Sequence, residues 1–262
     1  MAQGLQLLPL AGIPLVAEGD DLVALLLDAL GRDDLSLRDG DVLVIAQKIV
    51  SKSEGRLVRL ADVTPGAEAL ALAEETAKDP RLVQLILDES VKVVRKRTSP
   101  APGVPGVIIV EHRRGWVHAN AGIDQSNVRA GEPGEYALLL PVDPDASAQR
   151  LREALEKHFG CRLGVVINDS AGRAWRVGTC GIALGSAGVR AVMDLRGAPD
   201  MFGRILEVSV VGHADELAAA ASIVMGQADE ATPAVLVRGL PVAEAPGTAA
   251  DLIRASHEDL FR

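Results

Sequence analysis

The chain has 262 residues, which is enough for one large domain or two ordinary ones. Hydrophobic residues make up 48% of it but aromatic residues only 2%, so its core must be built mainly from aliphatic side chains. The formal net charge of −9 argues against a nucleic acid partner, because binding to a phosphate backbone requires a basic surface. The first residues lack the basic start of a signal peptide, and no apolar run approaches the ~20 residues that span a bilayer. We therefore expect a soluble cytoplasmic protein with no membrane partner.

The first part of the chain alternates short apolar strands with amphipathic helices. Strands are predicted over residues 6–10, 42–46 and 91–94, and helices over 21–30, 67–78 and 80–88. Asp20 or Asp21 can cap the first of these helices, and Pro80 favours the start of the third. The strand over 42–46 leads into a polar segment, 47–56, which is predicted to be a loop at a strand end.

The second part has the same elements in a less regular order. Strands are predicted over residues 107–110, 116–118, 138–140, 163–167, 206–211 and 235–237, and helices over 145–158, 215–225 and 249–261. A loop rich in proline and glycine, 99–106, is either a mobile lid or a plain surface excursion. The irregular alternation favours an α+β architecture with mixed sheets over a regular doubly wound sheet.

The segment 163–176 reads LGVVINDSAGRAWR and joins an apolar strand to a polar end. Asp169 and Ser170 at the end of a buried strand offer a carboxylate and a hydroxyl, which can hold a hard cation. Arg173 and Arg176 follow, and guanidinium groups can clamp phosphate oxygens. The alternative is that Asp169 and Ser170 only satisfy backbone groups in a turn.

Two further polar clusters resemble this one in character, at 120–127 and at 226–230. Asp124 and Asp169 could share one or two Mg²⁺ or Mn²⁺ ions, which commonly bind through a few carboxylates together with substrate phosphates. Lys52 and the two arginines would balance the charge of a triphosphate. Spacing alone does not show that these clusters meet in space.

Several common chemistries have no motif in this sequence. There is no P-loop, no G-x-G-x-x-G, no G-x-S-x-G and no H-x-x-x-H, so the five histidines are weak candidates for a site. Cys161 and Cys180 are too few for a disulfide framework or a zinc site and are expected to be small buried hydrophobes.

The polar clusters carry a resemblance to a known family. The strings SKSEGR at 51–56, NAGIDQSNV at 120–128 and NDSAGR at 168–173, in this order, resemble those of the coenzyme F420-0:L-glutamate ligases, also called F420 gamma-glutamyl ligases. The likeness covers nearly the whole chain, so it implies one ligase domain over 1–262, with mixed sheets in two intertwined subdomains. It also implies the single-module form, without the reductase-like C-terminal domain of some relatives.

The resemblance implies a reaction. Such ligases join L-glutamate through its amine to the terminal carboxylate of the deazaflavin precursor F420-0, in coenzyme F420 biosynthesis. They consume GTP through a probable acyl phosphate and release GDP and phosphate. Two divalent ions, Mg²⁺ or Mn²⁺, a K⁺ ion and a homodimer are further expectations. The alternatives are a metal-dependent phosphohydrolase or kinase acting on another phosphorylated metabolite, and a nucleotide-sensing scaffold dimer.

The resemblance also implies roles for individual residues. Asp124, Asp169, Ser170 and Gln227 are the expected metal ligands, and Asp124, Asp169 and Arg173 the expected catalytic residues. The expected nucleotide contacts are Ile13, Pro14, Leu15, Val16, Gln47, Lys48, Lys52, Asn127, Met225, Gly226, Gln227, Ala228, Asp229, Glu230, Ala231 and Thr232. Gln227 stands where an archaeal member has a metal-binding Glu, so its neutral carbonyl would hold the second ion more weakly unless Asp229 or Glu230 compensates.

Overall fold

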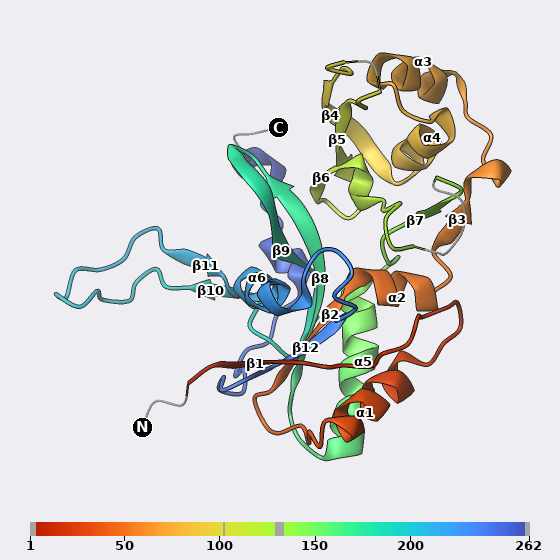
Figure 1. Ribbon diagram of the computed structural model, residues 1–262. Coiled ribbons are helices and arrows are strands. Elements are labelled where there is room, and N and C mark those ends of the chain that lie inside the picture. Colours follow the sequence, from red (N-terminus) through yellow and green to blue (C-terminus); the bar gives the residue numbers. More distant parts are fainter. Residues whose placement is uncertain (1–3, 102, 129–133, 260–262) are drawn as a thin grey trace.

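A five-stranded mixed sheet forms the centre of the fold in a computed structural model, which describes residues 4–101, 103–128 and 134–259 (Figure 1). Its strands, in spatial order, are β1 (Gln6–Pro9), β12 (Ala234–Arg238), β2 (Val42–Ala46), β8 (Gly164–Arg173) and β9 (Arg176–Ala187). Only β2 and β8 run parallel, and every other neighbouring pair is antiparallel. This sheet confirms the predicted α+β class with mixed sheets.

Helices cover both faces of this sheet (Figure 1). Successive side chains of a strand point to opposite faces, so Leu43 and Ile45 pack with α1 (Leu22–Arg32) and α5 (Pro144–Phe159). Val42 and Val44 pack on the other face with α6 (His213–Met225). Because β2 is buried on both faces, it reads as a continuous apolar run in the sequence.

A second core lies in the insertion between β2 and β8 (Figure 1). It contains α3 (Ala67–Thr76) and α4 (Pro80–Asp88), which accompany a sheet of β4 (Ser90–Arg97), β5 (Val107–His112) and β6 (Val117–Ala119). The antiparallel pair β3 (Leu57–Arg59) and β7 (Tyr136–Leu138) belongs to the two chain segments that connect this core to the first. The chain therefore leaves the first core after residues 47–53 and returns to it before α5.

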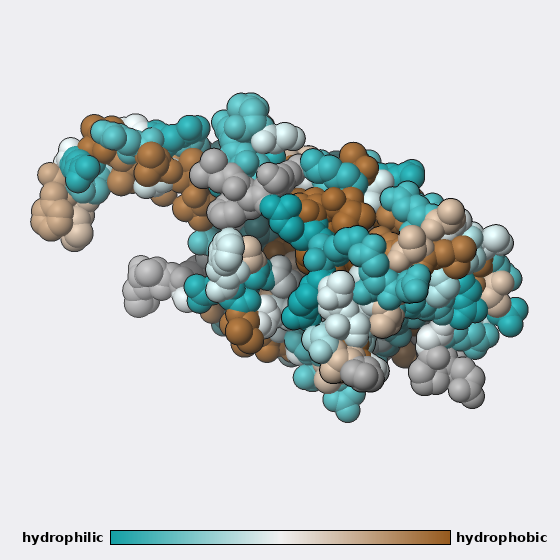
Figure 2. All heavy atoms as spheres, turned by 90° about the horizontal axis from the view of Figure 1, so that it is seen from above, coloured by the Kyte–Doolittle hydropathy of each residue, from teal (hydrophilic) through white to brown (hydrophobic). Residues whose placement is uncertain are grey.

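An arm projects from the body of the molecule (Figures 1 and 2). It begins with the antiparallel strands β10 (Val192–Asp194) and β11 (Val210–Gly212) and continues into the intervening segment, 195–209. Its exposed apolar side chains are Leu195, Met201, Phe202, Ile205, Val208 and Val210. Of the expected strand over 206–211, only Val210 and Val211 are in a strand, β11.

Three other sequence predictions need correction. Residues 47–53 form a helix, α2 (Gln47–Ser53), and not a loop, because Ile49 and Val50 pack into the first core. Strand β8 does not end at Asn168 but continues to Arg173, since its partner β9 extends the pairing.

The prediction of a closing helix over 249–261 is wrong: residues up to 259 form only the short 3₁₀ turns Ala249–Leu252 and Ser256–Glu258. Of these turns only Ala249 is buried and Leu252 is partly buried, which is too little packing to stabilise a longer helix. The predicted helix ends outside the described residues.

No helix in the described ranges has the length and apolar character needed to cross a membrane.

Candidate active site

Asp124 is held by the backbone of the segment that follows β6. Asn120 and Ala121 have φ values of 53° and 56°, and Gly122 follows with φ 70°. A Cβ on Gly122 would come within 2.7 Å of the Leu140 side chain, so this tight bend requires glycine. Beyond the bend, the Asp124 N–H donates to the Leu138 carbonyl (3.0 Å), and the Asp124 carbonyl accepts a hydrogen bond from the Leu138 N–H (2.8 Å). The carboxylate therefore starts from a rigid backbone position.

The first turn of α2 meets this carboxylate. The Gln47 amide accepts a hydrogen bond from the Ser51 hydroxyl (2.9 Å), and this bond leaves its Nε2 directed at Asp124 Oδ2 (2.8 Å). The Lys48 ammonium lies 3.5 Å from Asp124 Oδ1 and also donates to the Ser126 carbonyl (3.2 Å). Because Gln47 is 1% exposed, this arrangement is part of the packed interior.

Asp169 lies on β8 and completes a pair of carboxylates. Its side chain is 11% exposed, and burial together with the charge of Asp124 raises the pKa of Asp169 to about 7. Burial also raises the pKa of Asp124, while Lys48 and Gln47 act in the opposite direction. The site therefore contains two neighbouring carboxyl groups whose negative charges repel each other when both are ionised. A bound divalent cation would offset this repulsion.

His118 on β6 is a neighbour of this pair that sequence reasoning missed. Its Nδ1 lies 3.9 Å from Asp169 Oδ2, and burial lowers its pKa to about 4, so the ring is uncharged near neutral pH. A search for regularly spaced histidines could not find it. The sequence did contain one indication that His118 belongs to the site. It lies two residues before the polar segment 120–127, on a strand whose alternate residues face inward.

Two more polar groups of the site lie on the loop after α6. The Ser170 hydroxyl donates to Gln227 Oε1 (2.6 Å), which brings the oxygen atoms of two expected metal ligands together. Gly226, with φ 71°, begins this loop, and a Cβ there would come within 2.1 Å of the Glu230 side chain. Glu230 in turn accepts the Ala228 N–H (2.8 Å), so the loop has a defined shape.

Asn127 joins the loops to each other. Its side-chain amide donates to the Ala228 carbonyl (2.8 Å), and its own carbonyl accepts a hydrogen bond from the Lys52 ammonium (2.8 Å). Burial and the charge of Lys48 lower the pKa of Lys52. The four polar segments predicted separately from the sequence are thus connected by hydrogen bonds in the fold.

The other expected nucleotide contacts lie at the margins of this cluster. Ile13 and Val16 are buried in the first core, whereas Leu15 is 93% exposed and Pro14 is also exposed. Their segment passes the end of α2, where the Gly19 N–H donates to the Ser53 carbonyl (3.0 Å). Met225 is buried, and the expected contacts Asp229, Ala231 and Thr232 lie in the loop that follows it; the Thr232 hydroxyl donates to the Glu230 carbonyl (3.1 Å).

Arg173 does not lie near the carboxylates of Asp124 and Asp169. It faces Arg176 across the end of the β8–β9 hairpin and is exposed. Four residues of extended strand separate it from Asp169, which corresponds to roughly 13 Å. The hairpin thus holds Arg173 away from Asp124 and Asp169 in this conformation.

The donor set fits a hard cation that binds substrate phosphates. Among residues 4–101, 103–128 and 134–259, no three His, Cys, Asp or Glu side chains gather into a closed metal cage. Two carboxylates with a hydroxyl and an amide oxygen nearby form the open kind of site that Mg²⁺ uses, in which waters and phosphate oxygens supply the remaining ligands. The Oδ1 of Asn168, next in the chain to Asp169, is buried without a hydrogen bond partner in this part of the structure.

Comparison with known proteins defines the class to which this fold and site belong. Residues 12–239 match the family model described as F420-0:Gamma-glutamyl ligase. The chain therefore belongs to the F420-0:gamma-glutamyl ligase family.

The similarity to individual members extends over almost the whole chain. The chain is 45% identical to a coenzyme F420:L-glutamate ligase of Methanothermobacter thermautotrophicus, over 99% of both chains. It is 44% identical to the ligase of the same name from Methanopyrus kandleri, again over 99% of both. With that from Archaeoglobus fulgidus it shares 40% identity over 98% of this chain and 96% of the relative.

Proposed function

We propose that this protein is a GTP-dependent ligase that adds L-glutamate to F420-0 in the biosynthesis of coenzyme F420. Family membership supports the ligase chemistry. The observation that carries the proposal is the pairing of Asp124 and Asp169 beside Lys48 and Lys52, because it combines groups for a metal ion with groups for a polyphosphate.

The two lysines provide the nucleotide end of the proposed site. Lys48 and Lys52 are one helical turn apart on α2, and their like charges repel each other. A triphosphate bound beside them would relieve that repulsion and the partial burial of Lys52. Asn127 would then position the nucleotide from the neighbouring loop, together with the segments 13–16 and 225–232.

The carboxylates provide the metal end. Asp124 and Asp169, with Ser170 and Gln227, would hold two divalent ions, Mg²⁺ or Mn²⁺, and K⁺ would assist nucleotide binding. The divalent ions supply charge neutralisation for the phosphates of GTP when they are bound. Gln47 fixes Asp124, and neutral His118 adds no positive charge that would compete with a cation at Asp169.

The proposed chemistry proceeds in two steps. The terminal carboxylate of F420-0 attacks the γ-phosphorus of GTP, which forms an acyl phosphate and releases GDP. The amine of L-glutamate then attacks the acyl carbon, forms the amide bond and expels phosphate. Lys48 and Lys52 stabilise charge on the transferring phosphoryl group, while positioning and electrostatics supply most of the catalysis. Arg173 would contribute by binding a phosphate or substrate carboxylate if the hairpin approached the site.

A mass measurement tests the proposal. The protein is incubated with F420-0, L-glutamate, GTP and Mn²⁺, and the deazaflavin product should gain the mass of at least one glutamyl residue. Reactions without glutamate, or with ATP in place of GTP, serve as controls. GDP formation without any mass gain of the deazaflavin would instead support the phosphohydrolase alternative. If no nucleotide is turned over, only the nucleotide-sensing scaffold dimer is left.

We also propose that the protein forms a homodimer through the arm at 195–209. Met201 and Phe202 are 90% and 87% exposed near its end, and a surface of this kind is typical of an interface between copies of a chain. Light scattering after size exclusion should show a dimer for the wild type and a monomer for a variant with Phe202→Asp and Val208→Asp. Leu70→Asp on α3, which replaces an apolar residue that is 52% exposed and lies outside the arm, should leave the dimer intact. A monomeric wild type would refute the proposal.

A further inference from the structure

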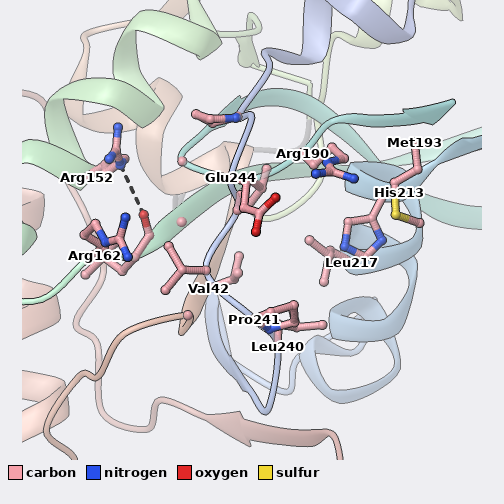
Figure 3. A pocket seen from close by; sticks show the side chains of 18 residues that line it. Val42, Arg152, Arg162, Arg190, Met193, His213, Leu217, Leu240, Pro241 and Glu244 are labelled. Atoms are coloured by element: carbon pink, nitrogen blue, oxygen red, sulfur yellow. Dashed lines mark hydrogen bonds between the residues drawn. The ribbon is translucent and has the colours of Figure 1, made fainter.

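A cavity of about 430 Å³ lies away from the proposed active site, and neither the proposed reaction nor the family resemblance uses it (Figure 3). It opens at the beginning of the parallel strands, where Val42 pairs with Gly164, whereas Asp169 is five residues further along β8. At the rise of an extended strand this separation is roughly 16 Å. A ligand here would therefore occupy a second site.

The floor of this cavity is apolar. Val42, Val189 and Leu217 contribute to it from β2, the bend after β9 and α6, and all three are at least nine-tenths buried. A Cβ on Gly164 would come within 2.3 Å of the Val189 side chain, so glycine allows these valines to close the floor. Leu240 and Pro241 complete one wall (Figure 3). A flat or apolar part of a small molecule can pack on such a surface.

The rim carries positive charge that the protein does not neutralise. Arg152 is paired with Glu156 (2.9 Å) and donates to the Leu163 carbonyl. By contrast, the guanidinium groups of Arg162 and Arg190 form no hydrogen bond and no ion pair with any residue that the structure describes. These groups stand on a chain with a formal net charge of −9, so a general excess of positive surface charge does not explain them.

Two other groups shape the electrostatics of the rim. Helix α6 begins here at His213, and its N-cap residue, Gly212, provides no side-chain cap, but Asp215 and Glu216 in the first turn offset the positive end of the helix. Glu244 is the one carboxylate that lines the cavity in the described part of the chain, and Figure 3 places it between Arg152 and Arg162 on one side and Arg190 and His213 on the other. It forms no ion pair within 4.0 Å there, so it competes with an anion without closing the site.

We propose that this cavity is a second binding site for a small polyanion, whose charged groups lie between Arg162 and Arg190 and whose apolar part rests on Val42, Val189 and Leu217. The shared chemistry is two or more phosphate or carboxylate groups, which guanidinium groups bind with charge-assisted hydrogen bonds. The proposal does not depend on the ligase activity, because binding here needs neither metal ions nor GTP.

Histidine resonances give a local test. The wild-type protein, with ¹³C-labelled histidine and in EDTA, is titrated with inorganic pyrophosphate and, separately, with citrate. The resonance of His213, assigned with a His213→Gln variant, reports on the cavity, and that of His118 reports on the proposed active site. We expect a saturable shift of His213 at polyanion concentrations that leave His118 unchanged. The tighter of the two ligands identifies phosphate or carboxylate as the preferred group.

Three variants sharpen this test. Arg162→Gln and Arg190→Gln should each weaken binding by about tenfold or more, because each removes a charged hydrogen bond donor. Glu244→Gln should strengthen it severalfold, since it removes the competing carboxylate. Arg95→Gln on β4 changes the net charge equally but lies outside the cavity, so it should have little effect.

Two results would overturn the proposal: no saturable shift of His213, or the same affinity in Arg190→Gln as in Arg95→Gln. GTP turnover of Arg190→Gln should equal that of the wild type. Failure of the cavity to bind polyanions and failure of the ligase proposal are therefore separate outcomes.

Discussion

At the scale of single residues, the Asp124–Asp169 pair decides what the site can do. Burial raises the pKa of both carboxyls, to about 7 for Asp169, and Lys48 forms an ion pair with Asp124. Asp169 is therefore the residue whose charge depends most on a bound metal ion. Its removal should affect function more than folding.

Asp169→Asn should abolish metal-dependent GTP turnover, with a loss of more than about 100-fold, because the amide cannot carry the negative charge that holds a divalent ion. Circular dichroism, and the midpoint of urea unfolding at pH 5, should remain close to those of the wild type. Asp62→Asn, at an exposed carboxylate, is the matched control and should keep full turnover. Full GTP turnover in Asp169→Asn would show that Asp169 is not part of the active site.

The same carboxyl makes stability depend on pH in the absence of metal. The pKa of Asp169 is about 7 in the folded protein against an ordinary value of 3.8, so the folded state holds a proton that the unfolded state loses. This contribution to stability is present below pH 4 and disappears as the pH rises towards 7 and above. The loss amounts to a few kcal/mol at most.

Urea unfolding at pH 5 and pH 8 in EDTA measures this effect. Asp169→Asn should lose less stability between the two values than the wild type does. Mg²⁺ should stabilise the wild type more at pH 8 than at pH 5, because the ion competes with the proton. Equal pH dependence in both proteins would show that Asp169 ionises normally.

At the scale of elements, close packing of β9 against the helices depends on its small residues. A Cβ on Gly181 would lie 2.4 Å from the Ala218 carbonyl of α6 and 2.2 Å from the Ser222 hydroxyl. Gly181→Ala should therefore push α6 away from the sheet and destabilise the protein by about 1–3 kcal/mol. Gly172→Ala, on the paired strand with open space around it, should be tolerated. Equal unfolding midpoints for the two variants would contradict this packing.

Elements with a strong local signal were predictable from the sequence. The predicted bounds of β2 are the observed ones, because this strand is buried on both faces and reads as a continuous apolar run. The predicted bounds of α4 are also the observed ones, because Pro80 defines its first residue. Tertiary packing decided the rest. Ile49 and Val50 turn a polar segment into α2, and pairing with β9 carries β8 past Asn168 to Arg173. The final segment forms only short 3₁₀ turns, in which Ala249 is buried and Leu252 is partly buried.

The candidate site was predictable in its residues but not in its geometry. The polar segments around Asp124 and Asp169 stand out in the sequence because they follow apolar strands. Their meeting depends on contacts far apart in the chain, such as Gln47 with Asp124 and Asn127 with Ala228. His118 reaches Asp169 only through the insertion of the second core, and Arg173 is carried away by the length of the hairpin.

At the scale of the whole molecule, the proposed active site lies where the two cores meet. Asp124 follows the second core, Asp169 belongs to the five-stranded sheet, and α2 bridges them. Any shift between the cores would change the separation of the two carboxylates, so binding of a metal–nucleotide complex should hold the cores together. The second-site cavity and the apolar arm lie on other parts of the first core.

The central claim is that phosphoryl transfer from GTP activates the carboxylate of F420-0. Its most direct test uses F420-0 labelled with ¹⁸O in that carboxylate, together with GTP, L-glutamate and Mg²⁺, and measures the mass of the phosphate released. An acyl phosphate transfers one carboxylate oxygen to phosphate, so each phosphate formed should carry one ¹⁸O. Phosphate without ¹⁸O, formed at the same rate with or without F420-0, would show hydrolysis of GTP by water and would contradict the proposed ligase mechanism.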